Sequence, residues 1–273
     1  MVLPVLISVV IISYNEEANI GRTLESVQPL VKDGRGEVIV VDSGSSDRTV
    51  EIAKSLGAKV FVEEWKGYAA QKNSAIEKAR GEWILSLDAD EAADSDLSAG
   101  AAVGLQAVAE DRGGKIYPAD LNGFRFRRRN YFLGRWIKHG GYWPDRKVRL
   151  FRKGCGRFEE RAVHESLRVD GAVWPMKGDL VHHSYPTLSE YIDHMNRYSS
   201  LGAEMAAAKG SRGFSLVNIV VRPALTFVYN YIFRLGFLDG REGLLLHMYH
   251  AAYVSWKYAK AWEMSRGTLH REV

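Results

Sequence analysis

The N-terminal part of the chain alternates between apolar runs and amphipathic stretches. Four runs rich in Val, Ile and Leu predict strands, and the stretches that follow the first three have the spacing of apolar and polar residues that favours helices. The predicted strands are residues 6–13, 37–42, 58–62 and 82–88, and the predicted helices are residues 16–30, 47–57 and 67–81. Continuous apolar strands alternating with helices indicate a parallel sheet covered on both faces, in which ligands bind at the carboxyl ends of the strands.

The pattern changes near Asn122 and again near Gly213. The middle part is aromatic and strongly basic, and it predicts short strands at "GFRFRR" and "KVRLFR", with turns at glycines and at Pro144. The part that follows Gly213 is apolar, aromatic and helical in pattern, with scattered basic residues. We therefore predict an α/β domain over residues 1–212 and a helical segment over residues 213–273.

The amino-acid composition restricts the kinds of protein that this chain can be. Apolar residues make up 46% of the 273, enough for a large core, and the net charge is only +4 although the isoelectric point is about 9.0. Cys155 is the only cysteine, which excludes an intramolecular disulfide and favours a reducing compartment. The apolar N-terminus lacks the basic start and the cleavage site of a signal peptide, and no run reaches the roughly 18 apolar residues of a spanning helix. We expect a cytoplasmic protein.

The run "ILSLDADE", residues 84–91, ends a predicted buried strand with Asp88, Asp90 and Glu91. Because like charges this close repel, either the acids lie in a solvated turn or a positive group offsets them. Carboxylate oxygens in this position suit Mg²⁺ or Mn²⁺, which keep coordination positions open for phosphate oxygens.

Polar side chains also end the first two predicted strands. "SYNEEANI" places Asn15 and Glu17 after the first strand, and "VVDSGSSDRT" places Asp42 at the end of the second and Asp47 at a helix start, where it suits an N-cap. The carboxylate of Asp42 could accept a hydrogen bond from a base or a ribose hydroxyl. Asn15, Asp42 and Asp88 are thus predicted at one edge of the sheet.

Together, "SVVIISYNEEANIGRTLESV", "EVIVVDSGSSDRTVEIAK" and "QKNSAIEKARGEWILSLDADE" resemble family 2 glycosyltransferases with a GT-A fold, over residues 5 to about 200. The resemblance implies a UDP-sugar donor, with Asp42 facing the uracil and with Lys72 and Asn73 flanking the diphosphate. Asp88 and Asp90 resemble the family's Asp-x-Asp motif, with Asp90 the better metal ligand. The implied donor-binding residues are Tyr14, Asn15, Glu16, Asp42, Lys72, Asn73 and Asp88.

The downstream runs "YWPDRKVRLFRKG", "VHESL" and "VHHSYPTLSEYIDHMNRYS" are similar to a subgroup that adds sugars to the inner core of lipopolysaccharide. This similarity implies transfer of a hexose, first of all glucose, to a glycolipid, with a polyprenyl-phosphate or other surface-polysaccharide acceptor as the alternative. It favours His182 as a further metal ligand. Tyr142, Trp143 and Arg149 are predicted on the acceptor side, although both aromatic rings could instead pack internally.

Transfer from a nucleotide sugar requires neutralisation of the leaving diphosphate and a carboxylate that deprotonates the acceptor hydroxyl. Glu159, Glu160 and Glu165 are candidates for this base in an inverting reaction. Glu165 is the first choice, because it follows His164 and occupies a position that resembles an acidic element of the family. Glu160 is the second.

The basic and apolar segments leave two questions open. Arg125 and the run Arg127 to Arg129 form either a solvated strand face or a contact for anionic acceptors or phospholipid headgroups. In the C-terminal segment, Arg222 and Arg234 argue against a spanning helix. An interfacial helical hairpin at the inner face of a membrane competes there with a tertiary or homo-oligomer interface. A nucleic-acid partner is not expected, because the acidic strand ends would repel it.

Overall fold

The structure is a computed structural model, and it describes residues 7–34, 36–111, 116–159, 166–210 and 214–269. The chain divides into two compact units, one formed by residues 1–128 and 145–182 and the other by residues 129–144 and 183–273. The predicted domain boundary at residue 212 lies outside the described ranges, and it stays a prediction.

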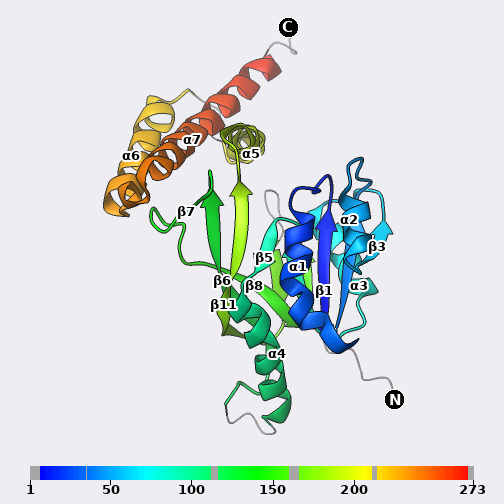
Figure 1. Cartoon of the computed structure of the whole chain (residues 1–273). Helices are drawn as coiled ribbons and strands as arrows, with labels where there is room; N and C mark the ends of the chain where they lie inside the picture. Colours follow the sequence, from blue (N-terminus) through cyan, green and yellow to red (C-terminus); the bar gives the residue numbers. More distant parts are fainter. Residues whose placement is uncertain (1–6, 35, 112–115, 160–165, 211–213, 270–273) are drawn as a thin grey trace. The chain divides into compact units, whose positions relative to one another are not determined.

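The first unit is built from strands and helices that alternate in its N-terminal half (Figure 1). Its strands are β1 (Ile7–Ser13), β2 (Gly36–Asp42), β3 (Lys59–Val62), β4 (Trp83–Asp88), β5 (Glu91–Ala93), β8 (Asp145–Arg152), β9 (Gly156–Glu159) and β10 (Ser166–Val169). Its helices are α1 (Ile20–Val31), α2 (Thr49–Ser55), α3 (Tyr68–Lys78) and α4 (Ser95–Glu110), with a 3-10 turn at Lys32–Gly34. Two long strands, β6 (Leu121–Phe132) and β11 (Ala172–Tyr185), begin in the first unit and end in the second.

Within the described residues, the main sheet has nine strands in the order β3-β2-β1-β4-β8-β6-β11-β5, with β7 (Arg135–Trp136) paired to β6. The strands β1 to β4 pair in parallel, as the alternating pattern predicts, and β8 and β6 extend the sheet in antiparallel pairing. Ser13 lies opposite Asp42, and Ile12 lies opposite Asp88. The carboxyl ends of β1, β2 and β4 therefore meet at one edge, where the sequence predicts the polar cluster.

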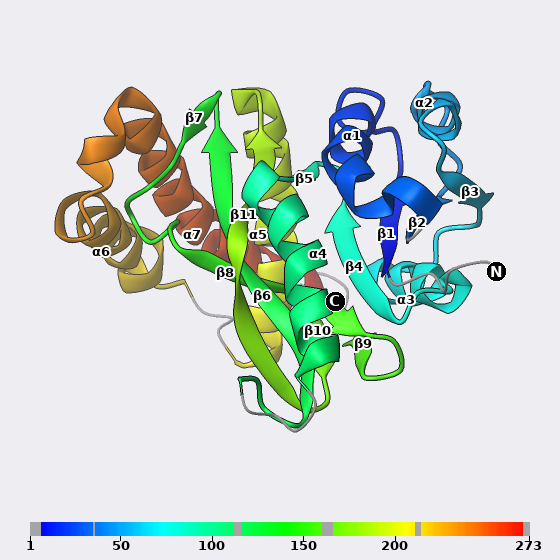
Figure 2. The same cartoon turned by 60° about the horizontal axis from the view of Figure 1, so that its bottom comes forward.

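Helices cover both faces of the parallel part of the sheet (Figure 2). Leu24 of α1 packs in the same apolar cluster as Val9, together with residues of α2 and α4. Ile76 of α3 packs on the opposite face in the same cluster as Val10. Val9 and Val10 are neighbours in β1, and they join different clusters because successive side chains of a strand point to opposite faces. This explains why the predicted strands are apolar throughout.

Glu37 is a buried acid that ties together the amino-terminal ends of these strands. Its Oε1 accepts hydrogen bonds from the Ser8 hydroxyl at 2.8 Å and from the backbone N–H of Arg80 at 2.7 Å. Its Oε2 lies 2.7 Å from Nζ of Lys59 and 3.0 Å from Nε of Arg80. Burial alone would raise the pKa of Glu37, but these hydrogen bonds outweigh it and lower the pKa from 4.5 to about 2.

We expect Glu37→Gln to lower the free energy of unfolding at pH 7 by about 2–3 kcal/mol, because the carboxylate is stabilised in the folded state by its depressed pKa. That contribution is complete above the unfolded pKa and is lost as pH falls from about 4.5 toward about 2. Urea unfolding of both proteins across this range measures it. Glu82→Gln is the control, because the Glu82 side chain is 56% exposed. A difference that does not shrink with falling pH would contradict the assignment.

The second unit is mostly helical, as the apolar pattern after Gly213 predicts. It contains β7, α5 (Leu188–Ala208), α6 (Arg222–Val228) and α7 (Gly240–Leu269), with π-helical turns at Val217–Val221 and Tyr229–Phe233 and a 3-10 turn at Gly236–Asp239. Its core is formed by Phe132, Ile137, Tyr191 and Leu246. No helix in the described ranges is long and apolar enough to cross a membrane.

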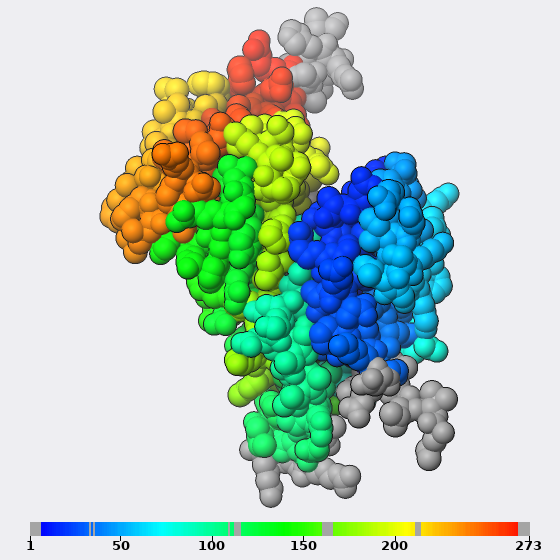
Figure 3. Space-filling view, in the orientation of Figure 1, coloured from blue at the N-terminus to red at the C-terminus, as the bar shows by residue number. Residues whose placement is uncertain are grey.

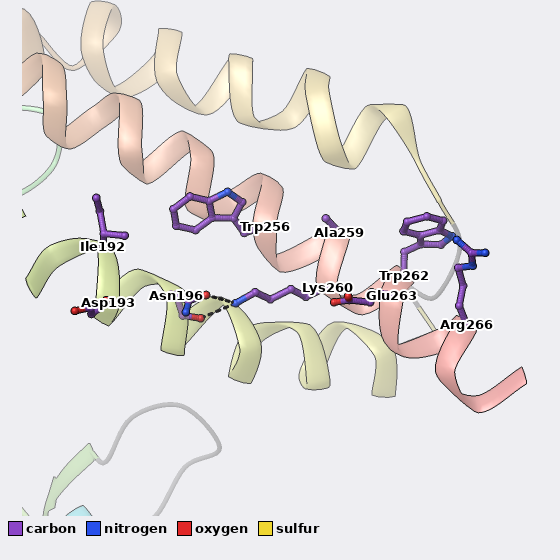
Figure 4. Close-up of a pocket in the computed structure, with 9 residues that line it drawn as sticks. All are labelled: Ile192, Asp193, Asn196, Trp256, Ala259, Lys260, Trp262, Glu263 and Arg266. Atoms are coloured by element: carbon purple, nitrogen blue, oxygen red, sulfur yellow. Dashed lines mark hydrogen bonds between the residues drawn. The ribbon is translucent and has the colours of Figure 1, made fainter. Parts of the chain in front are cut away.

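Lys260 anchors α7 on α5. Its ammonium donates hydrogen bonds to the backbone oxygen and Oδ1 of Asn196, at 2.8 and 2.6 Å (Figure 4). The hydroxyls of Ser199 and Ser200 also lie within hydrogen-bond distance of it, at 2.8 and 2.9 Å. Beside these contacts lies a groove of about 790 Å³ between the two helices, and Trp256 is one of the side chains that line it. The hydrogen-bond donors of Lys260 are therefore satisfied within the unit.

Candidate active site

The acids predicted at the end of β4 are matched by buried basic side chains. Nζ of Lys72 lies 2.6 Å from Oδ1 of Asp88, and Nη2 of Arg149 lies 2.6 Å from Oδ2. The Lys72 side chain is only 2% exposed. Burial alone would raise the pKa of Asp88, but the charges of Arg149 and Lys72 outweigh it and hold that pKa well below its usual range. The repulsion between neighbouring acids is thus offset by the protein itself, and Asp88 is a carboxylate.

Glu91 is the internal partner of this cluster, a role that the sequence alone does not reveal. It is fully buried, and its Oε1 accepts hydrogen bonds from Arg149 at 2.7 Å and from Arg128 at 2.9 Å. Burial would raise the pKa of Glu91, but Arg149 and Arg128 lower it overall. Arg128 also bonds to Asp145 at 2.9 Å, so this member of the basic run points inward. Its inward position follows from the alternation of β6, in which Phe124 and Phe126 are buried.

Asp90 and His182 lie side by side at the same strand end. Oδ2 of Asp90 is 3.0 Å from Nε2 of His182, and the two side chains are 27% and 16% exposed. The antiparallel pairing of β5 with β11 sets His182 opposite Glu91, which brings the imidazole to the acids despite the long sequence separation. The structure therefore brings Asp90 and His182 together, and the role of these residues and Asp88 as metal ligands stays a prediction.

These residues fit a divalent cation only in part. Two ligand atoms bound at about 2.1 Å and at a right angle would lie about 3.0 Å apart, which is the spacing of Asp90 Oδ2 and His182 Nε2. Carboxylate and imidazole are both suitable ligands for such ions. Asp88 differs, because Lys72 and Arg149 engage both of its oxygens. Among the described residues, no group of three or more His, Cys, Asp and Glu is placed to hold a metal. Asp90 and His182 are thus the better ligands, and coordination by Asp88 stays a prediction.

Asp42 is fully buried at the end of β2. Its carboxylate accepts hydrogen bonds from the Ser13 hydroxyl, from the backbone N–H groups of Gly44 and Ser45 and from the Ser45 hydroxyl, at 2.6 to 3.0 Å. These bonds shape the loop that follows β2. This structural role was not predicted from the sequence, and the contact of Asp42 with a base stays a prediction.

The loop after β1 presents the next three predicted donor residues. Tyr14 is 60% exposed, and Asn15 has a left-handed φ of 54° with its Oδ1 accepting a hydrogen bond from the backbone N–H of Ser46 at 2.9 Å. The pKa of Glu16 is raised by burial and by repulsion from nearby acids that include Asp90. Glu16 therefore lies within electrostatic range of the cluster, and its contact with a donor stays a prediction.

The two predicted residues of α3 have different surroundings. Lys72 contacts Asp88 and also lies 5.0 Å from the ring centroid of Phe158. The side chain of Asn73 is joined to β9, because its Nδ2 donates to the backbone oxygen of Phe158 at 2.9 Å and its Oδ1 accepts from the N–H at 3.0 Å. Lys72 is thus a buried partner of Asp88, and Asn73 holds β9 against α3. The predicted contacts of both residues with a diphosphate stay predictions.

The predicted acceptor residues all have contacts within their own units. Tyr142 packs in the apolar cluster of the second unit, where burial raises its pKa to about 12, and the Trp143 ring lies 5.1 Å from that of Trp136. Arg149 is a buried ion-pair partner in the first unit. Their roles toward an acceptor stay predictions. Glu160 and Glu165 lie outside the described residues.

Comparison with known proteins identifies the family to which the chain belongs. The sequence model of Glycosyl transferase family 2 matches residues 8–153. The lipopolysaccharide core biosynthesis glycosyltransferase LpsC of Rhizobium meliloti (strain 1021) is 31% identical over 270 residues, covering 94% of this chain and 92% of LpsC. The uncharacterized glycosyltransferase RT0209 of Rickettsia typhi (strain ATCC VR-144 / Wilmington) is 31% identical over 255 residues, covering 88% of this chain and 80% of that protein.

A solved structure supports the fold. Mannosyltransferase PcManGT from Pyrobaculum calidifontis, in complex with GDP-Man and Mn²⁺, has a TM-score of 0.54 at 16% identity, with 94% of this chain and 87% of that chain covered. The predicted GT-A fold is confirmed. The chain belongs to glycosyl transferase family 2, and it is a glycosyltransferase.

Proposed function

We propose that this enzyme transfers a hexose from a UDP-sugar to a glycolipid, with inversion at the sugar carbon, and that the reaction depends on a divalent cation. The cluster of Asp88, Asp90 and His182 with Lys72 and Arg149 carries the proposal. It combines ligands for a cation with fixed positive charge at the strand ends where α/β sheets bind ligands.

The donor and the metal are proposed on separate grounds. The resemblance of the strand-end motifs favours UDP, and glucose is the first candidate sugar. The similar structure of PcManGT contains GDP-Man and Mn²⁺, which supports a nucleotide-sugar donor and a cation of this kind. Uridine and guanosine donors therefore need to be compared directly.

The acceptor is proposed from the relative LpsC, whose name places it in lipopolysaccharide core biosynthesis. The match spans nearly the whole length of both proteins, so it supports a shared acceptor class better than a match of the N-terminal part alone would. We propose the inner core of lipopolysaccharide as the acceptor and the cytoplasmic face of the inner membrane as the site of reaction.

Different residues of the chain would bind the cation, fix the buried charges and accept the proton. Asp90 and His182 would hold the cation, which supplies positive charge to the leaving diphosphate when bound. Lys72 and Arg149 fix the carboxylate of Asp88, and Glu91 holds Arg149 from the buried side. Glu165, with Glu160 as the alternative, would accept the proton of the attacking hydroxyl. This arrangement neutralises the leaving group without rearranging buried charges.

A thermal-shift series tests the donor and the metal together. At a concentration of 100 times Kd, UDP-glucose should raise Tm by about 5 °C in the presence of Mn²⁺ or Mg²⁺, because ligand binding stabilises the folded state. UDP-galactose, UDP-N-acetylglucosamine and GDP-mannose provide the comparison, and EDTA provides the metal-free control. Stabilisation by GDP-mannose alone would contradict the proposal of a UDP-sugar donor. Equal stabilisation in EDTA would contradict the proposed dependence on a divalent cation.

A further inference from the structure

The second unit exposes an unusual number of large apolar side chains over residues 214–238. We refer to the exposed side chains of this range as the apolar face. Its most exposed members include Leu216 at 65%, Leu225 at 62% and Phe233 at 73%. Figure 3 shows much of this range, coloured yellow to orange, at the surface of the second unit. Exposed apolar area of this extent marks an interaction surface rather than an ordinary solvated one.

In the helical part of this range, the uncharged polar side chains of Asn and Thr are partly buried. Asn218, Thr226 and Asn230 are half-buried, whereas Leu225, next to Thr226, and Phe233, three residues after Asn230, are exposed. A surface helix of a water-soluble protein has the opposite arrangement, with its apolar stripe toward the core. The apolar face is therefore oriented for an apolar environment.

Polar contacts help to hold the same segment on α7. The Ser255 hydroxyl donates to the backbone oxygen of Ile219 at 2.8 Å, and the Arg222 guanidinium donates to the Tyr258 hydroxyl at 2.5 Å. Pro223 is buried. These contacts fix the orientation of the segment without covering its apolar side chains.

The charge of this segment indicates the kind of surface that it fits. Residues 214–238 include no Asp or Glu, and Arg222 and Arg234 are the charged residues of this range. The next acid, Asp239, is buried and accepts hydrogen bonds from the backbone and the ring of His139. Arg241 follows and is exposed. An apolar range whose own charged residues are all basic is complementary to anionic phospholipid headgroups above acyl chains.

We propose that the apolar face inserts into the interfacial region of an anionic lipid bilayer, with Leu225 and Phe233 among the inserted side chains. This inference rests on the proposed function in one respect, because membrane binding would bring the enzyme to the glycolipid acceptor that we propose. Insertion parallel to the surface agrees with the absence, over the described residues, of a helix that could span.

Flotation of the full-length protein with vesicles that contain no glycolipid acceptor tests the insertion separately from transfer. The protein should float with vesicles of phosphatidylcholine and phosphatidylglycerol, and at least about tenfold less with phosphatidylcholine alone. The double variant Leu225→Ser, Phe233→Ser should bind the anionic vesicles at least about tenfold more weakly, because both side chains lose apolar area. Its Tm and its shift with UDP-glucose should match those of the wild type.

The matched control is Val103→Ser, Ile116→Ser, which removes two apolar side chains of 69% and 70% exposure from the first unit. It should float as the wild type does. The inference fails if the wild type does not float, or if the Leu225→Ser, Phe233→Ser protein floats equally well. If sedimentation shows that the same variant dissociates an oligomer while vesicles bind neither protein, a second copy of this chain covers the face instead. A separate transfer assay, with UDP-sugars and vesicles that carry a lipopolysaccharide inner-core acceptor, tests the proposed function. Flotation together with no detectable transfer in that assay would leave the membrane contact standing and overturn the proposed function.

Discussion

Replacing Asp90 by Asn should abolish the stabilisation of the enzyme by UDP-sugar with Mn²⁺ and should reduce transfer by about 10²–10³-fold. Asp90 lies 3.0 Å from His182 at the edge of the cluster, and no Lys or Arg of the described residues forms an ion pair with it. Its carboxylate is therefore available to a cation in a way that the carboxylate of Asp88 is not. Thermal shift reports the loss of binding, and release of UDP reports the loss of transfer.

Asp88→Asn is the informative comparison, because it removes the counter-charge of two buried cations rather than an available ligand. Lys72 and Arg149 would lose their shared partner, so Tm should fall even without any ligand. Asp90→Asn should leave the Tm of the unliganded protein nearly unchanged. His182→Gln should weaken the response to Mn²⁺ in the same direction as Asp90→Asn. Full activity of the Asp90→Asn enzyme in EDTA would remove the metal from the mechanism.

The sequence predicts the parallel half of the fold well because its signals are local. Strands β1 to β4 are continuous apolar runs, and each is followed by polar residues where a turn is needed. Parallel pairing then forces Asp42 and Asp88 to the same edge, since their positions in register depend only on strand order. The edge of the sheet could therefore be located from pattern alone.

The partners of the acids could not be predicted in the same way. Arg149, Arg128 and His182 come from β8, β6 and β11, and their positions depend on antiparallel pairing between distant segments. A one-residue change of register would turn each of these side chains to the other face of its strand. The sequence showed Arg128 and Arg149 as members of basic runs, and only the pairing distinguishes a buried counter-ion from a solvated charge.

Asp42 shows a second limit of prediction from the sequence. A carboxylate at a strand end looks the same in sequence whether it binds a ligand or its own loop. The structure shows that Gly44 and Ser45 donate to it, a local turn of the kind that Asp commonly forms. The small residues that follow Asp42 were the available signal for this turn, and they also suit a loop near a nucleotide.

Replacing Glu165 by Gln should leave binding of UDP-sugar and metal unchanged and should lower the rate of transfer by about 10²–10⁴-fold, the contribution of a general base. The segment of residues 160–165 connects Glu159 to Ser166, which pair directly across the β9–β10 hairpin. Two residues before that connection, Phe158 is bound by Asn73 and lies against Lys72, the partner of Asp88. The strand before the segment is thus attached to α3, the helix that contributes Lys72 to the acid cluster, and this attachment supports the prediction of a base in the segment.

Glu160→Gln is the matched control, because it removes the same charge from the same segment. The Glu160→Gln enzyme should retain transfer within about tenfold of the wild type, a change too small for the loss of a general base. Single-turnover rates at saturating donor separate the chemical step from binding, and the thermal shift with UDP-glucose and Mn²⁺ confirms that the donor site is intact. Because the two variants differ only in which carboxylate remains, comparing their rates decides whether Glu165 or Glu160 is the general base. An inactive Glu160→Gln enzyme beside a fully active Glu165→Gln enzyme would transfer the role of the base to Glu160, and full activity of both would place the base outside this segment.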